Sequence, residues 1–164
     1  MRILGVDPGL GTTGYGVIEA ERGTSCRVVE AGVIRTTRYR TLPVRLQRLY
    51  EQVSGVMSDC RPDVVVLEEL YAHYEHSLAV IRMGHARGVI CLAVAMAGVP
   101  LVGYTAKRVR KAVTGNGNAS KEQVAQMVVR WLGLARVPTP NDVTDALAVA
   151  IGHALIMESE QVLV

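Results

Sequence analysis

The first 35 residues alternate between short apolar runs and brief polar or glycine-containing connections. The first run covers residues 2–7 and stops at Asp7, and residues 14–20 and 26–35 are rich in β-branched side chains. Runs of this length, bounded by turn-forming residues, are typical of β-strands. The pattern therefore predicts three consecutive strands joined by tight connections, which is the start of an antiparallel meander.

The rest of the chain alternates between helical and strand patterns. Leucines and valines recur every three or four positions over residues 42–57, which predicts an amphipathic helix. The uninterrupted apolar run at residues 63–67 is typical of a strand covered on both faces, and residues 101–104 predict a fifth strand. Four further helices are expected at residues 77–96, 105–113, 120–134 and 140–157. This order predicts an α/β protein whose mixed five-stranded sheet carries helices on both faces.

Composition supports one globular domain spanning residues 1–164. Hydrophobic residues make up 49% of the chain and charged residues 20%, which excludes a disordered or fibrous protein. No charged leader followed by an apolar segment opens the sequence, and no stretch of about 18 uninterrupted apolar residues follows. We therefore expect a cytoplasmic protein that makes no contact with a membrane.

Positive charge is concentrated in two places, although the net charge is only +3. Five arginines lie between Arg35 and Arg48, and four more basic residues lie between Lys107 and Lys111. Such clusters make nucleic acid a plausible partner, but a solvated surface explains the charge alone equally well. The three cysteines are odd in number and lack metal-ligand spacing, which argues against a disulfide framework or a zinc site.

Four carboxylates stand at the ends of predicted elements, where α/β proteins assemble their active sites. Asp7 ends the first strand, Glu68 follows the fourth, and Asp142 and Asp145 lie near the start of the last helix. Residues three apart on a helix share a face, so the two aspartates can point to one locus. If the sheet brings all four together, they form a set of hard oxygen ligands suited to Mg²⁺ or Mn²⁺.

Each carboxylate also has an ordinary explanation. Asp7 could be a turn residue, Glu68 a salt-bridged strand end and Asp145 a charge on a helix face. Asp142 stands where an acid is expected in the first turn of a helix that is capped by Thr139 and opened by a proline. The joint placement of the four residues, rather than any one of them, favours a metal site.

The segment from Gly9 to Gly14 reads GLGTTG and matches the glycine pattern of dinucleotide-binding loops. That pattern has to open a helix, whereas the residues after Gly14 predict a strand. A glycine-rich turn between two strands is instead similar to the phosphate hairpin of the actin and sugar-kinase superfamily. Because that superfamily builds its ATP site between two such domains, a chain of 164 residues argues against it.

Five segments together resemble the RuvC family of Holliday-junction endonucleases over essentially the whole chain. They are GVDPGLGTTGYGV, VVLEELY, GHARGV, YTAKRVRKAVTGNGNASKEQV and NDVTDALAVAIGH, in the family's order and spacing. The resemblance implies a ribonuclease H-like fold and a metal-dependent endonuclease of DNA recombination and repair. It also implies that Asp7, Glu68, Asp142 and Asp145 are the catalytic metal ligands, with Glu68 rather than Glu69 in the family's motif.

The resemblance further implies residues that contact DNA. Tyr71 matches a position where an aromatic side chain stacks on bases near the junction centre. Arg110 and Lys121 match basic positions that act in catalysis or phosphate contact, and Lys111 adjoins them. The loop at residues 71–76 departs from the family's usual lysine and asparagine residues, so contacts at the junction centre are expected to differ.

The symmetry of the expected substrate bears on the assembly. A four-way junction has approximate two-fold symmetry, so cleavage of two opposed strands calls for a homodimer, and we expect the helix at residues 77–96 to form its interface. The resemblance implies two Mg²⁺ or Mn²⁺ ions per site, four-way junction DNA as substrate and the RuvA and RuvB branch-migration proteins as partners. Two other functions stay open, a related exonuclease and a junction-binding protein without nuclease activity.

Overall fold

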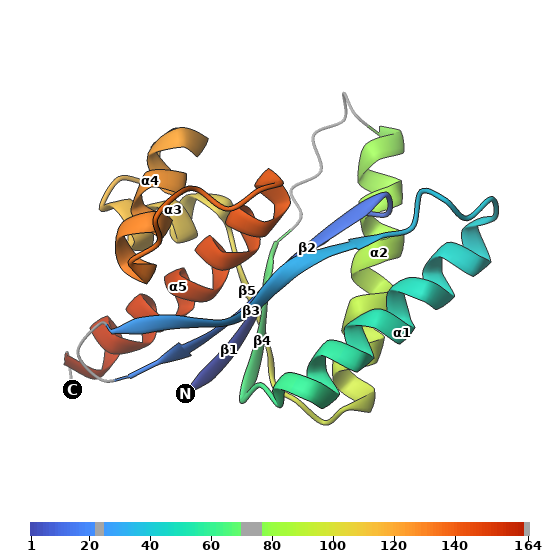
Figure 1. The fold of residues 1–164 in the computed structure, drawn as a ribbon, viewed down its shortest axis with the longest axis horizontal. Helices are drawn as coiled ribbons and strands as arrows, with labels where there is room; N and C mark the ends of the chain where they lie inside the picture. Colours follow the sequence, from blue (N-terminus) through green and yellow to red (C-terminus); the bar gives the residue numbers. More distant parts are fainter. Residues whose placement is uncertain (22–24, 70–76, 163–164) are drawn as a thin grey trace.

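The structure, a computed structural model, describes residues 1–21, 25–69 and 77–162, and a mixed sheet lies at its centre (Figure 1). The strands are β1 (Arg2–Asp7), β2 (Thr12–Ala20), β3 (Cys26–Arg35), β4 (Val64–Glu68) and β5 (Leu101–Tyr104). Their spatial order is β3-β2-β1-β4-β5, in which β2 is antiparallel to β1 and β3, whereas β4 is parallel to β1 and β5. The predicted antiparallel meander and mixed five-stranded sheet are both confirmed.

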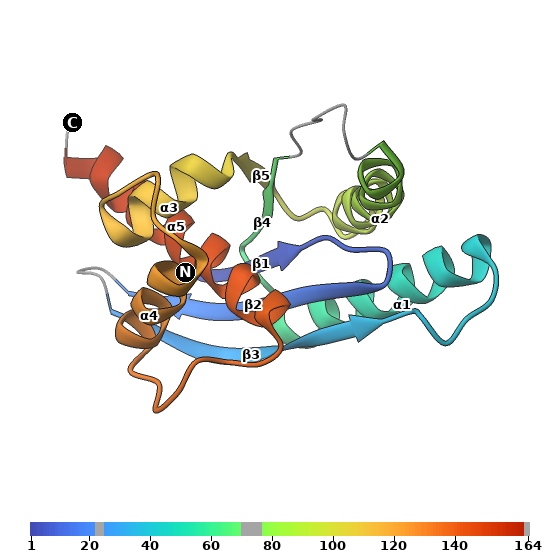
Figure 2. The ribbon, with the colours of Figure 1, turned by 90° about the horizontal axis from the view of Figure 1, so that it is seen from above.

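Helices cover both faces of this sheet, as Figure 2 shows from above. They are α1 (Leu42–Cys60), α2 (Ser77–Met96), α3 (Ala106–Thr114), α4 (Lys121–Leu132) and α5 (Asn141–Val162). The helices α1 and α2 pack on one face, and α5 packs on the other with α3 and α4 beside it. Every helix predicted from the apolar spacing is present, with ends displaced by a few residues.

Alternation along the central strands determines which side chains meet which helices. In β1, Ile3 joins the core on the α5 side, whereas Leu4 joins the core under α1 and α2. In β4, Val66 lies on the α5 side and Leu67 on the opposite side. Successive residues of a strand point to opposite faces, so a strand covered on both faces is apolar at every position. This is why β4 is an uninterrupted apolar run in the sequence.

Glycines in β1 and β2 allow α5 to lie directly on the sheet. A Cβ atom on Gly5 would stand 2.1 Å from the carbonyl oxygen of Ala146, and one on Gly14 would stand 2.0 Å from that of Asp142. Both separations are far shorter than a van der Waals contact, so no larger residue fits at either position without moving the helix. The two glycines therefore fix the height of α5 above the strands.

The start of α5 differs from the predicted one. The helix begins at Asn141, and the preceding Thr139–Pro140 peptide bond is cis. The alternative in which Thr139 caps a helix opened by Pro140 is not supported, because Pro140 itself directly precedes the helix. Asp142 nevertheless lies in the first turn, where a negative charge is stabilised by the exposed backbone N–H groups.

Helix α2 has one buried face and one exposed apolar face. The buried face carries four of the helix's own residues, Ala86, Ile90, Ala93 and Val94. The exposed face carries four larger apolar side chains, Leu78, Ile81, Leu92 and Met96. By length and composition alone, the segment Leu78–Met96 is apolar enough to cross a membrane. Because one face of α2 packs against the sheet and α1, we interpret the apolar composition as that of a helix with two packing faces.

Candidate active site

The carboxyl ends of β1 and β4 lie side by side at one edge of the sheet. The two strands are parallel, with Val6 opposite Leu67, and neighbouring strands are about 4.8 Å apart. Asp7 and Glu68 are the next residues of their strands, and the alternation described above turns both side chains toward α5. Strand pairing thus brings together two of the four carboxylates that the sequence singles out.

The first two turns of α5 bring the other two carboxylates to the same place. The backbone of Asp142 packs over Gly14, and Gly14 is the residue paired with Asp7 across β1 and β2. Asp145 follows one turn later, and its side chain is 29% exposed. The tight contact between α5 and the two strands therefore places Asp142 and Asp145 next to Asp7.

Burial and the negative charge gathered at this place together raise the pKa of Asp7. Burial, and then the nearby charges of Asp145, Glu68 and Asp142, raise the pKa of Asp7 from an ordinary value of 3.8 to about 7. The positive charge of Lys121 acts in the opposite direction. Since each of the other three carboxylates contributes to this shift, all three lie within electrostatic reach of Asp7.

Glu68 shares this environment. Burial, followed by the charge of Asp145, raises the pKa of Glu68, whereas Arg110 and Lys121 lower it. Glu69, the next residue, is exposed, and its side chain lies against Gly103 of β5 instead. The structure thus turns Glu68 rather than Glu69 toward the other carboxylates, as the family's motif implies.

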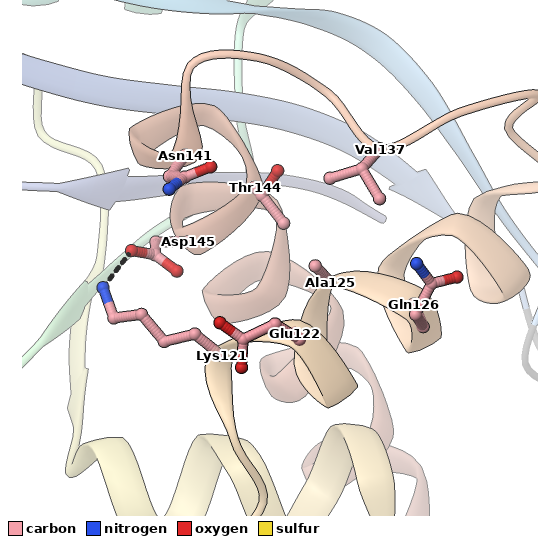
Figure 3. A pocket seen from close by; sticks show the side chains of 8 residues that line it. All are labelled: Lys121, Glu122, Ala125, Gln126, Val137, Asn141, Thr144 and Asp145. Carbon is pink, nitrogen blue, oxygen red and sulfur yellow. Dashed lines mark hydrogen bonds and ion pairs between the residues drawn. The ribbon is translucent and has the colours of Figure 1, made fainter.

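Lys121 is bonded directly to one member of the acidic cluster. Its Nζ donates a hydrogen bond of 2.9 Å to Oδ2 of Asp145, and this bond raises the pKa of Lys121. Figure 3 shows the pair beside a pocket of about 200 Å³ between α4 and α5, to which Asn141 and Thr144 also contribute. The side chain of Lys121 is 70% exposed, so it can also reach a ligand from solvent.

A helix cap fixes the position of Lys121. Ser120 is the N-cap of α4, where its hydroxyl accepts a hydrogen bond from the backbone N–H of Gln123. The amide of the Gln123 side chain in turn accepts from the backbone N–H of Ser120. Such a reciprocal capping box stabilises the first turn of a helix, and Lys121 is the first residue of α4.

The other predicted DNA-contact residues have different outcomes. Arg110, on α3, is close enough to Glu68 to lower the pKa of that carboxyl. Lys111 is exposed on α3 and is not among the charges that act on Asp7 or Glu68, so the structure does not bring it into the cluster. Tyr71, and the loop at residues 71–76 that contains it, lie outside the described residues.

Two contacts that support the carboxylates were not predicted. Nη1 of Arg87, on α2, donates a hydrogen bond of 2.6 Å to the carbonyl oxygen of Glu68 and holds the end of β4. The hydroxyl of Thr13, which is fully buried, donates to the carbonyl oxygen of Gly9 at 2.7 Å and braces the turn after Asp7. The only sequence signals for these roles are an arginine in an apolar helix and a threonine in a glycine-rich turn.

The chemistry of the cluster fits a divalent metal ion. Carboxylate oxygens are the preferred ligands of Mg²⁺ and Mn²⁺, and four carboxyl groups gather here beside Lys121 and Arg110. Among the described residues, however, no three His, Cys, Asp or Glu side chains stand close enough to hold an ion as they are placed. The carboxylates are therefore the right type of ligand for such an ion, but they stand farther apart than the ligands of a closed metal site.

The glycine-rich turn is part of this site in a different way from a nucleotide loop. The turn connects β1 directly to β2, so no helix begins at its glycines. A dinucleotide fingerprint needs that helix to receive the pyrophosphate. The prediction that a strand rather than a helix follows the turn is confirmed.

Comparison with known proteins identifies the family. The model of the family described as "Crossover junction endodeoxyribonuclease RuvC" matches residues 3–153. This chain belongs to the RuvC family. A RuvC protein of Rhodopirellula baltica is 49% identical over 154 residues, which are 93% of this chain and 86% of that relative. One from Caldicellulosiruptor saccharolyticus is 42% identical over 159 residues, or 97% and 95% of the two chains.

Solved structures agree with the RuvC assignment. Thermus thermophilus RuvC, solved in complex with a Holliday junction substrate, superposes with a TM-score of 0.92 at 33% identity, over 98% of this chain and 96% of that one. The yeast mitochondrial Holliday junction resolvase Ydc2 has the same fold, with a TM-score of 0.72 at 14% identity, over 98% and 80% of the two chains. The predicted family and its ribonuclease H-like fold are confirmed, and the two-domain sugar-kinase alternative is not supported.

Proposed function

We propose that this chain is a Holliday-junction resolvase, an endonuclease that cuts two opposed strands of a four-way DNA junction. The observation that carries the proposal is the convergence of Asp7, Glu68, Asp142 and Asp145 beside Lys121, in a member of the RuvC family. The T. thermophilus relative solved with a Holliday junction substrate supports the choice of DNA structure. The four carboxylates are the proposed catalytic and metal-binding residues.

The proposed cofactors are Mg²⁺ or Mn²⁺, with two ions in each site. Such ions activate water for attack on a phosphodiester and stabilise the leaving 3′ oxygen. The raised pKa of Asp7 supports this assignment. Besides burial, it reflects repulsion from the neighbouring carboxylates, which a divalent cation would neutralise. To ligate an ion, Asp145 would have to exchange its bond with Lys121 for the metal.

The basic residues then act on the DNA. Lys121, once released from Asp145, and Arg110, which lies near Glu68, are the proposed phosphate-binding residues. They would hold the nonbridging oxygens of the scissile phosphate by charge-assisted hydrogen bonds. In the proposed hydrolysis a water oxygen bonds to phosphorus and the bond from phosphorus to the 3′ oxygen breaks. The attacking water gives up a proton and its oxygen stays on the 5′ phosphate, and the leaving 3′ oxygen takes up a proton to become the 3′ hydroxyl.

The proposed assembly is a homodimer formed through the exposed apolar face of α2. Four large side chains of this face, Leu78, Ile81, Leu92 and Met96, are between 54% and 71% exposed. Large apolar side chains exposed along one helix are typical of an interaction site. Two sites related by a two-fold axis would match the symmetry of a four-way junction.

The remaining parts of the proposal rest on the RuvC family rather than on contacts in this structure. We propose that the chain functions as one domain over residues 1–164, in the cytoplasm and without a membrane. Tyr71 and Lys111 are proposed to contact the junction, and RuvA and RuvB to be partners. The contacts with DNA and with RuvA and RuvB can be tested by direct binding measurements.

The test is cleavage of a labelled four-way junction and of a matching linear duplex in Mg²⁺ or Mn²⁺. We expect paired symmetric nicks in the junction only, and loss of cleavage in Asp7→Asn and Glu68→Gln. Glu69→Gln is the matched control, because Glu69 adjoins Glu68 but is exposed and faces Gly103. It should cut like the wild type.

Other outcomes separate the alternatives. Degradation from strand ends would indicate an exonuclease, and tight junction binding without nicks in either metal would indicate a binding protein. Equal cutting of junction and duplex would indicate a general endonuclease. Any of these three results would contradict the resolvase proposal.

A further inference from the structure

A groove with a strongly basic rim lies between the end of β3 and the start of α1. Its volume is about 520 Å³, and its lining includes Arg35, Thr37, Arg38, Tyr39, Arg48 and Gln52. We call it the arginine groove, after Arg35, Arg38 and Arg48. None of these residues belongs to the carboxylate site or to α2, so the proposed mechanism and dimer leave the groove unexplained.

Most of the positive charge in the arginine groove is uncompensated. Arg48 forms an ion pair with Glu51 at 2.7 Å. Within residues 1–21, 25–69 and 77–162, no carboxylate lies within ion-pair distance of Arg35, Arg38 or the neighbouring Arg40, and all three side chains are exposed. Such a surface favours a polyanionic ligand.

Tyr39 organises two of the guanidinium groups. The guanidinium carbon of Arg38 lies 4.9 Å from the centre of the Tyr39 ring, and that of Arg48 lies 5.5 Å from it. Stacking on an aromatic ring restricts an arginine side chain. Nη2 of Arg38 also donates to the Tyr39 hydroxyl and Nη1 of Arg48 to Oε2 of Glu51, both at 2.7 Å, which leaves the other guanidinium nitrogens as donors for a ligand. The groove therefore presents ordered donors of the kind that bind phosphate oxygens in pairs.

The arginine groove lies at the same end of the strands as the carboxylates, where β1 and β3 finish. Strand β3 is parallel to β1, since both are antiparallel to β2, and the register aligns Asp7, Gly14 and Val33 across the three strands. Arg35 is two residues beyond Val33. Two strand spacings and two residues of rise place its Cα roughly 12 Å from that of Asp7.

A direct contact ties this groove to the turn after Asp7. Arg45, between the other arginines, donates from Nη2 to the carbonyl oxygen of Leu10 at 3.0 Å, and from Nε to the hydroxyl of Thr36 at 3.1 Å. The backbone N–H of Thr36 also donates to the carbonyl oxygen of Gly11 at 3.0 Å. Hydrogen bonds therefore hold the segment that lines the groove and the active-site turn in fixed positions relative to each other.

We propose that the arginine groove binds the sugar–phosphate backbone of a duplex arm of the DNA junction, a few base pairs from the phosphate that is cut. A separation of roughly 12 Å corresponds to about three to four base pairs at a rise of about 3.4 Å. The contact is with phosphates and is independent of sequence. This inference rests on the proposed function, since it assigns a second contact for the same substrate.

The test compares junction binding by the double variant Arg35→Ala/Arg38→Ala with that by Arg27→Ala. Arg27 is also an exposed arginine of β3, but it lies at the opposite end of the strand and pairs with Glu19. Fluorescence anisotropy with a labelled junction in EDTA, over a series of salt concentrations, measures affinity without cleavage. Losing two phosphate contacts should lower the slope of log K against log salt by about 1.8 and weaken binding about tenfold at moderate salt. Arg27→Ala should keep the wild-type slope.

A modified substrate locates the contact. Replacing the phosphates about three to five nucleotides from the cut by uncharged methylphosphonates should weaken wild-type binding but hardly change binding by the double variant. If the double variant has the slope of Arg27→Ala, or loses as much affinity on the modified junction as the wild type does, the groove does not bind DNA. An unchanged slope would also be the result if an acidic protein were its partner.

The same proteins distinguish this inference from the proposed function. With enzyme in excess of the measured dissociation constant, the double variant should make paired nicks at the wild-type rate, because its carboxylates are intact. A wild type that binds DNA through the groove but makes no nicks would support the groove and contradict the resolvase. Conversely, paired nicks by the wild type, together with the same salt slope of binding for the double variant and Arg27→Ala, would support the resolvase and contradict the groove.

Discussion

Among the carboxylates of the site, Asp7 has the largest rise in pKa. Its pKa of about 7 means that the folded, metal-free protein holds a proton on Asp7 that the unfolded chain releases near pH 4. Folding stability contributed by Asp7 is therefore highest at low pH and falls as the pH rises from about 4 to about 7. A bound divalent cation would remove this penalty.

We predict that Asp7→Asn raises the thermal stability of the metal-free protein at alkaline pH. The amide carries no charge that folding would bury, so the variant should melt about 3 °C or more above the wild type at pH 8 and close to it at pH 4. Thermal melts in EDTA at both pH values measure this. With Mg²⁺ or Mn²⁺ the wild type should gain stability and Asp7→Asn should gain less. Parallel pH profiles of the two proteins would contradict the prediction.

Lys121 provides a second test at this scale. Because its side chain is 70% exposed, loss of the bond to Asp145 in Lys121→Met should change the free energy of unfolding by less than about 1 kcal/mol. The single-turnover cleavage rate should fall about 100-fold or more, since the variant lacks a cation at the reacting phosphate. Glu122→Gln changes the adjacent side chain of the same pocket and should retain most activity. A rate unaffected by Lys121→Met would exclude a role for this residue in cleavage.

At the scale of elements, the contact of α5 with β1 and β2 holds the site together. The helix carries Asp142 and Asp145, the strands carry Asp7, and glycines separate them. Packing at this distance is possible only without side chains, so the position of the aspartates depends on residues that have no functional groups of their own.

We predict that Gly14→Ala impairs both stability and cleavage. Its Cβ would stand 2.0 Å from the carbonyl oxygen of Asp142, so α5 has to shift, at a cost of about 1–3 kcal/mol. Cleavage should fall further than unfolding alone explains, because Asp142 moves with the helix. The control is Gly55→Ala in α1, where no atom lies within 4 Å of the added Cβ and the change should stabilise the helix by about 0.5–1 kcal/mol. Denaturant unfolding and cleavage below the transition measure both effects.

On the scale of the whole molecule, the two faces of the sheet have different roles. The α5 face supplies the site, whereas α1 and α2 cover the opposite face and leave apolar side chains exposed on α2. The strand ends connect the two layers, because Arg87 of α2 holds the carbonyl of Glu68. Assembly through α2 would therefore act close to the active site.

The proposed dimer predicts the behaviour of Leu92→Glu. Leu92 is 56% exposed on α2, and a buried charge at a dimer interface has a large desolvation cost. Sedimentation should show a dimer for the wild type and a monomer for the variant, with paired nicks replaced by single ones. Val44→Glu introduces the same charge at a 40% exposed apolar residue of α1 and should remain dimeric. A monomeric wild type, or a dimeric Leu92→Glu, would contradict the proposed interface.

The sequence by itself determined the elements, the sheet class and the family. Apolar runs of period two and of three to four residues are local signals, so strands and helices could be predicted without knowledge of their neighbours. Carboxylates that end apolar strands, such as Asp7 and Glu68, are costly where they stand, and this made them recognisable. The resemblance of ordered motifs to the RuvC family supplied the expected roles.

Only the tertiary structure decided how these parts meet. The alternation of a strand is known from its sequence, but which face α5 covers is set by packing, and this turns Asp7 and Glu68 toward Asp142 and Asp145. The close approach over Gly14, the bond from Arg87 to the carbonyl of Glu68 and the stacking of two arginines on Tyr39 join residues from different elements. Such contacts depend on how elements pack in three dimensions, and no local pattern encodes that packing.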